Sequence, residues 1–97
     1  MNLYAIRRRD AWTSPQELEA AAERSTTEGD KADSGVRWIR SYVLAEDSGR
    51  LGSVCIYEAE SPEAIRAHAD AAGMPADEIV PVADSVIVRP DPESVVA

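Results

Sequence analysis

Residues 14–23 have the sequence SPQELEAAAE and residues 61–70 have the sequence SPEAIRAHAD, so the chain carries two similar segments. In each segment a serine, which can accept hydrogen bonds from unpaired amides, precedes a proline, which is favoured at the first position of a helix. Both segments therefore predict helix starts, and Gly73 predicts the end of the second helix. At 100° per residue each helix carries one face of small and apolar side chains. These faces consist of Leu18, Ala21, Ala22 and Ser25 in the first helix and of Ile65, His68, Ala69 and Ala72 in the second.

Strand-like segments flank both predicted helices. They cover residues 2–8, 36–44 and 51–59, followed by residues 78–88 in a broken form, and the polar residues 46–50 suit a hairpin. The order of elements is therefore βαββαβ. It predicts an α+β, ferredoxin-like fold in which a four-stranded antiparallel sheet carries two helices on one face. The other face stays open, and small proteins of this plan often join their sheets as a dimeric α+β barrel, so we expect a homodimer.

The length of 97 residues corresponds to one domain. We expect a single ferredoxin-like domain over residues 1–89 and a C-terminal tail over residues 90–97, because prolines interrupt the chain there. The polar residues 26–35 are expected to form a mobile loop.

The charge and cysteine content narrow the possible partners. Ten Lys and Arg against eighteen Asp and Glu give a net charge of −8, which repels phosphate backbones and anionic lipid surfaces. We therefore expect neither nucleic acid nor a membrane as a partner. The single cysteine excludes an intramolecular disulfide, and the chain shows neither a leader peptide nor an apolar run of membrane-spanning length. The expected location is cytoplasmic.

Several aromatic and polar residues lie on the predicted strands. Alternation places Trp38, Arg40 and Tyr42 on one face of the strand over residues 36–44. If this set and Tyr57 of the next strand line the open face, a dimer would enclose a pocket suited to a planar or anionic small ligand. The alternative is that these aromatics fill the barrel or the dimer interface.

Cys55 and His68 are the candidate metal ligands. His68 lies on the apolar face of its predicted helix and should point toward the sheet, either as a base or metal ligand or as a hydrogen-bonded core residue. Cys55 could pair with His68 as a thiolate, or be an inert buried cysteine. A closed zinc-type site needs four donors, so carboxylates or a second subunit would have to complete a metal site.

The only basic cluster consists of Arg7, Arg8 and Arg9. It could clamp an anion, or its members could pair with the abundant acidic residues nearby. The sequence contains no nucleotide-binding glycine motif, zinc-protease motif, C-x-x-C pair or G-x-S-x-G motif.

Three motifs in order, W-x-x-S-Y-V at residues 38–43, C-x-Y-x-A at residues 55–59 and G-x-P-A-D at residues 73–77, resemble a family of small bacterial domains that includes nickel-binding proteins. The resemblance covers residues 36–82, with a weaker match at residues 4–9. It implies a ferredoxin-like fold, a dimeric barrel, and nickel or another divalent transition metal as a candidate cofactor. The matched site positions are Trp38, Ser41, Tyr42, Cys55, Tyr57 and His68.

The chain departs from this family at two places. Arg40 stands where members often have a histidine, and Val80-Pro81-Val82 stands where they have an acidic residue. A guanidinium offers no lone pair and repels a cation, so Arg40 favours an anionic organic ligand.

The expected function is that of a small cytoplasmic binding protein of the nickel-binding-protein-like family. Its ligand, a divalent metal or a small anionic organic molecule, would lie at the open sheet face of a dimer. A cofactor-free enzyme such as a cyclase, isomerase or monooxygenase-like protein is the alternative, with Arg40 holding an anion, Tyr42 or Tyr57 orienting it and His68 acting as base. A structural or regulatory dimer is a third possibility.

Overall fold

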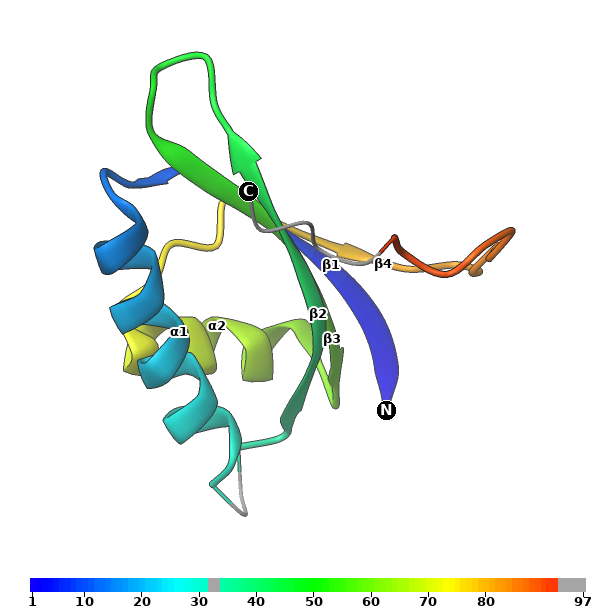
Figure 1. The fold of residues 1–97 in the computed structure, drawn as a ribbon. Coiled ribbons are helices and arrows are strands. Elements are labelled where there is room, and N and C mark those ends of the chain that lie inside the picture. The colour runs from blue at the N-terminus through cyan, green and yellow to red at the C-terminus, as the bar shows by residue number, and fades with distance from the viewer. Residues whose placement is uncertain (32–33, 93–97) are drawn as a thin grey trace.

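The computed structural model describes residues 1–31 and 34–92 and contains four strands and two helices in these ranges. The elements are β1 (Asn2–Trp12), α1 (Pro15–Gly29), β2 (Val36–Ala45), β3 (Leu51–Ala59), α2 (Pro62–Ala72) and β4 (Glu78–Pro81). The strands form one antiparallel sheet in the order β2-β3-β1-β4. Both helices cover the same face of this sheet (Figure 1). The predicted βαββαβ order and ferredoxin-like fold are confirmed.

Both helices begin where the sequence predicts. The side chain of Ser14 accepts a hydrogen bond from the Glu17 amide at 3.2 Å, and Ser61 accepts one from the Ala64 amide at 3.1 Å. Each bond satisfies an amide that has no partner inside the helix. At the end of α2, Gly73 has a φ of 68°, the left-handed conformation that glycine adopts without steric cost.

Helix α1 is longer than expected and shortens the loop predicted over residues 26–35. It continues through Gly29, because the helical hydrogen-bond pattern persists up to the bond from the Asp30 amide to the Thr26 carbonyl. The Thr26 hydroxyl adds a bond to the Ala22 carbonyl at 3.0 Å inside the helix. The prediction of a loop was therefore wrong for residues 26–29, while residues 32 and 33 lie outside the described residues.

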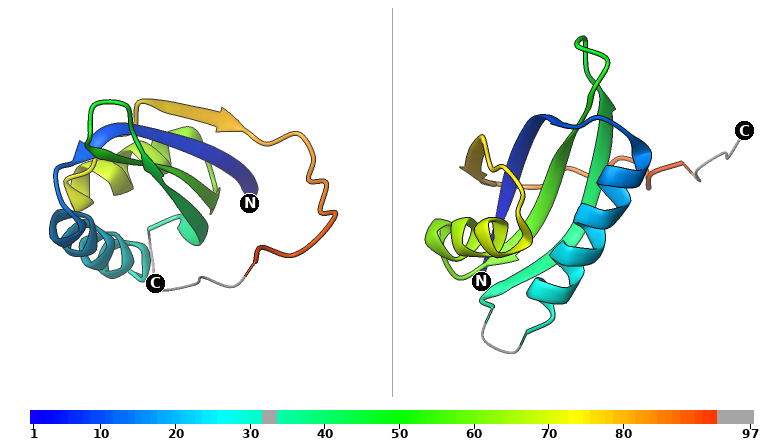
Figure 2. Two further views of the ribbon diagram at one scale, coloured as in Figure 1. Left: turned by 45° about the horizontal axis from the view of Figure 1, so that its top comes forward. Right: turned by 90° about the vertical axis from the view of Figure 1, so that its left-hand side faces the viewer.

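Strand β4 is shorter than the segment predicted over residues 78–88. It pairs with β1 from Glu78 to Pro81, and the Val82 amide donates once more to the Leu3 carbonyl at 3.0 Å. Because β1 begins at Asn2, little partner backbone remains beyond this point. The chain then leaves the sheet, arcs outward and returns toward β2 (Figure 2). The prediction of a strand was thus wrong for residues 82–88.

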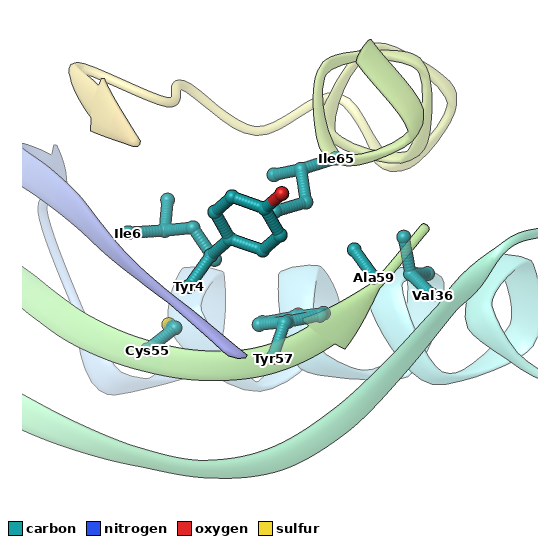
Figure 3. Close-up of a cluster of buried hydrophobic side chains, with 7 residues drawn as sticks. All are labelled: Tyr4, Ile6, Val36, Cys55, Tyr57, Ala59 and Ile65. Atoms are coloured by element: carbon teal, nitrogen blue, oxygen red, sulfur yellow. The ribbon is translucent and has the colours of Figure 1, made fainter. Parts of the chain in front are cut away.

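The core lies between the sheet and α2. Tyr4 and Ile6 of β1 point toward Ile65 of α2, and Tyr57 of β3 lies beside them (Figure 3). The other members of this cluster are Val36, Cys55 and Ala59. Within the described residues, no helix is both long and apolar enough to cross a membrane.

Candidate functional site between α1 and the sheet

A cavity of about 690 Å³ lies between α1 and the helix-facing side of the sheet. Its sheet wall includes Arg8 and Trp12 of β1, Trp38 of β2, and Ser53, Cys55 and Tyr57 of β3. Helix α1 supplies the opposite wall through Leu18, Ala22 and Ser25. The exposed side chains of Ile39 and Val43 on β2 also line the cavity, so it opens at this edge of the sheet. Apolar walls with a few polar groups are typical of a small-molecule site.

An irregularity in β2 determines which side chains reach the cavity. Trp38 pairs with Tyr57, but the next pair is Arg40 with Ile56, so Ile39 is an extra residue in β2. Such a bulge reverses the alternation of side chains along a strand. Trp38 therefore shares the helix-facing side with Tyr57, while Arg40 lies on the open side with Ile56. The prediction that Trp38, Arg40 and Tyr42 share one face was wrong for this reason.

Trp38 and Tyr57 form an aromatic pair at the cavity. Their rings are nearly parallel, with an interplanar angle of 6° and a centroid separation of 6.1 Å. The indole nitrogen of Trp38 donates to the Ser41 hydroxyl at 2.8 Å, which fixes the exposed part of the ring. Both rings lie on the helix-facing side of the sheet, so the expectation that Trp38 and Tyr57 line the open face was wrong.

Arg40 and Tyr42 instead contact the C-terminal segment. The Tyr42 hydroxyl donates to the Asp91 carboxylate at 2.8 Å, and the Arg40 guanidinium donates to the same carboxylate at 3.2 Å. These contacts bring the end of the described chain back to the far edge of the sheet. Tyr42 does not line the cavity, whereas Arg40 lies at its border.

Tyr57 connects the sheet to both helices. Its side chain is buried, and its hydroxyl lies 2.8 Å from the Ser25 hydroxyl of α1. Burial raises the pKa of the Tyr57 phenol, against the opposing effects of the Ser25 hydrogen bond and the Arg8 charge. Tyr57 is therefore neutral at physiological pH.

His68 points toward the sheet, as its place on the apolar face of α2 predicts. It is buried, its ring centroid lies 5.4 Å from that of Tyr57, and its Nε2 atom lies 2.9 Å from the Ser25 carbonyl oxygen. Because a carbonyl oxygen only accepts, Nε2 donates the proton. Its Nδ1 atom has no partner among the described residues, and the ring does not line the cavity.

The described residues do not form a self-contained metal site. No three His, Cys, Asp or Glu side chains come together within residues 1–31 and 34–92. The Cys55 sulfur accepts a hydrogen bond from the Ser41 hydroxyl at 3.0 Å, and His68 is engaged through Nε2. Cys55 and His68 would need donors from outside the described part of one chain, so metal binding by these residues stays a prediction.

The three consecutive arginines have different environments. Arg7 forms an ion pair with Glu46 at 2.7 Å, and Arg9 pairs with Glu78. Arg8 lies on the other face of β1, has an exposed fraction of 0%, and lines the cavity. None of its three guanidinium nitrogens has a hydrogen-bond partner in the described part of the chain. Pairing with local acids is therefore present for Arg7 and Arg9 only.

The spacing of residues along β1 already distinguishes Arg8 from the two other arginines of this cluster. Tyr4, Ile6 and Arg8 are two residues apart, so alternation along β1 places all three on the buried face. Applied to Arg8, this pattern predicts an arginine inside the protein.

Comparisons with known proteins agree with this fold. The sequence matches the family described as "Nickel responsive protein SCO4226-like" over residues 4–82. The crystal structure of SCO4226 from Streptomyces coelicolor A3(2) is similar, with a TM-score of 0.71 and 24% identity, covering 87% of this chain and 99% of that chain. No curated protein matches the sequence. Because the family match spans most of the chain, contains both helices and overlaps all four strands, this chain belongs to the SCO4226-like family of nickel-responsive proteins.

Proposed function

We propose that this chain is a binding protein that holds a small organic molecule in the cavity between α1 and the sheet. The observation that carries the proposal is the cavity itself, with its volume of about 690 Å³ and its aromatic and aliphatic walls. Sites for small molecules have volumes of about 300–1,000 Å³ and combine apolar walls with a few polar groups. The proposed site is thus on the helix-facing side of the sheet and not on its open face.

A neutral fluorescent probe, N-phenyl-1-naphthylamine, tests this function. We expect the probe to bind the wild-type protein with one-to-one stoichiometry and increased fluorescence. Ala22→Trp should weaken binding by about tenfold or more, because the indole would occupy the cavity next to α1. Ala20→Trp is the matched control, since Ala20 is exposed on the same helix and does not line this cavity. Equal binding by both variants would refute the proposed site.

Nickel is the second candidate ligand, because the family is described as nickel-responsive. His68 retains an unpartnered Nδ1 atom, and Cys55 is the single thiol. A second copy of the chain could supply the further donors. Uptake of nickel in integral stoichiometry by the dimer, lost in His68→Ala, would support this alternative over the organic ligand.

The enzymatic alternative has less support from the geometry. Arg40 and Tyr42 lie with Asp91 on the open side of the sheet, whereas His68 lies on the helix side. The sheet therefore separates the proposed anion-holding group from the proposed base.

We also propose that the open sheet face joins two copies as a homodimer. Leu3, Ala5, Val54 and Ile56 lie half-buried on this face, beside Val80 with an exposed fraction of 49%. Burying such apolar side chains against a second copy would be favourable.

Val54→Asp should convert the dimer to a monomer, because it buries an unpaired charge in the interface. Ala20→Asp on the exposed side of α1 is the control and should remain a dimer. Light scattering after size-exclusion chromatography measures the molecular mass of each variant. A monomeric wild-type protein would contradict this proposal.

A further inference from the structure

We infer that the cavity is selective for a small organic molecule bearing a single carboxylate, which the Arg8 guanidinium binds. This inference rests on the proposed function and specifies the class of its ligand. It is carried by a buried cation that no acceptor among the described residues satisfies.

The surroundings of Arg8 differ from those of the two arginines beside it in β1. Its neighbours Arg7 and Arg9 face the open side of the sheet, where Glu46 and Glu78 neutralise them. Arg8 pairs across the sheet with Ser53 on the helix-facing side and is fully buried. A buried arginine keeps its charge, because its guanidinium is not deprotonated in proteins.

The protein compensates this charge only in part. The Arg8 guanidinium carbon lies 5.8 Å from the centroid of the Tyr57 ring, within the range of a cation–π interaction. This interaction leaves all three guanidinium nitrogens without acceptors in the described residues. Burying an ion without hydrogen bonds is costly, so Arg8 reduces stability in the free protein and gains acceptors when an anion binds.

The shape and charge of the site define the ligand. A guanidinium presents a planar fork of donors that matches the two oxygens of a carboxylate. One buried arginine balances one negative charge, and the net charge of −8 of the whole chain disfavours more highly charged anions. The walls formed by Trp12, Trp38 and Leu18 suit an apolar and aromatic body attached to the carboxylate.

Two acid and amide pairs test the inference by isothermal titration calorimetry. The probes are indole-3-acetate with indole-3-acetamide, and phenylacetate with phenylacetamide, which differ in charge but little in shape. We expect each acid to bind the wild-type protein at least about tenfold more tightly than its amide. Arg8→Met should abolish this preference, and Arg8→Lys should retain only part of it, because an ammonium lacks the planar fork.

The melting temperature of the same variants separates a binding role from a structural one. Without ligand, Arg8→Met should melt at a higher temperature than the wild type, because a thioether is buried at lower cost than an unpaired charge. A lower melting temperature of Arg8→Met would show that the guanidinium supports the fold and would overturn the inference. Arg9→Met is the matched control and should leave the acid preference unchanged.

The outcomes also distinguish this inference from the proposed function. Equal binding of acids and amides, together with probe binding that Ala22→Trp blocks, would overturn the carboxylate and leave the organic-ligand site in place. Failure of the neutral probe, the acids and the amides to bind at millimolar concentration would overturn both.

Discussion

Tyr57→Ala is expected to lower the free energy of unfolding by about 4 kcal/mol, since removing a large buried aromatic side chain costs about 3–5 kcal/mol. The Tyr57 side chain has an exposed fraction of 2% and contacts three other parts of the fold. Its ring stacks on Trp38 and lies beside His68, and its hydroxyl bonds to Ser25. The substitution would join the vacated space to the ligand cavity, so the structure could not collapse to fill it.

Chemical denaturation followed by tryptophan fluorescence measures this loss. Tyr42→Ala is the matched control, because Tyr42 is 44% exposed and its hydroxyl donates to the Asp91 carboxylate at the surface. We expect the control to change the free energy of unfolding by less than about 1 kcal/mol. Tyr57→Phe should cost about 1–3 kcal/mol, because it leaves the buried Ser25 hydroxyl without this partner. A loss below about 1 kcal/mol for Tyr57→Ala would contradict the position of Tyr57 in the core.

Gly52→Ala is expected to lower the free energy of unfolding by about 3 kcal/mol, at the upper end of the cost of overpacking. A Cβ atom at Gly52 would lie 2.6 Å from the Arg8 carbonyl oxygen and 2.9 Å from the Glu46 carboxyl carbon. The carbonyl cannot move freely, because β1 and β3 are paired through Arg8 and Ser53. Displacing Glu46 would also disturb its ion pair with Arg7.

Gly29→Ala is the matched control for Gly52→Ala. Its Cβ atom would lie 3.6 Å from the His68 Nε2 atom, an ordinary van der Waals distance, and Gly29 lies in α1. Because alanine favours helices over glycine, we expect a gain of up to about 1 kcal/mol. The midpoint of thermal or denaturant unfolding compares the two variants. If Gly52→Ala were as stable as the wild type, the close approach of β3 to β1 at this point would be wrong.

Gly52→Ala should also change ligand binding at the cavity. A shift of the Arg8 carbonyl moves the backbone that carries the guanidinium, so the preference for acids over amides should fall in Gly52→Ala. Because Gly29 itself lines the cavity, Gly29→Ala is a control for stability and not for the ligand preference.

The helix starts and the order of elements could be predicted from the sequence because they depend on local interactions. Ser14 and Ser61 bind amides three residues away, and Gly73 adopts a left-handed conformation that most other residues avoid. Helical periodicity likewise placed His68 correctly on the buried face of α2. None of these features requires a partner far away in the chain.

The composition of the candidate site depended on tertiary contacts. The bulge at Ile39 arises from the pairing of β2 with β3 and moves Arg40 and Tyr42 to the face opposite Trp38. A prediction that assumes regular alternation cannot include such an insertion. The length of β4 likewise depends on where its partner β1 begins, which the local sequence does not indicate.

For the three arginines of β1, too, one property depends on the local sequence and another on tertiary contacts. The sequence by itself determined that Arg7, Arg8 and Arg9 alternate across a strand, because successive side chains of a strand point to opposite faces. Only the tertiary structure decided that Glu46 and Glu78 approach Arg7 and Arg9, while the helix-facing side brings Arg8 a tyrosine ring and a cavity. The charge balance of a buried group depends on side chains that folding brings together from distant parts of the chain, and strand periodicity carries no information about them.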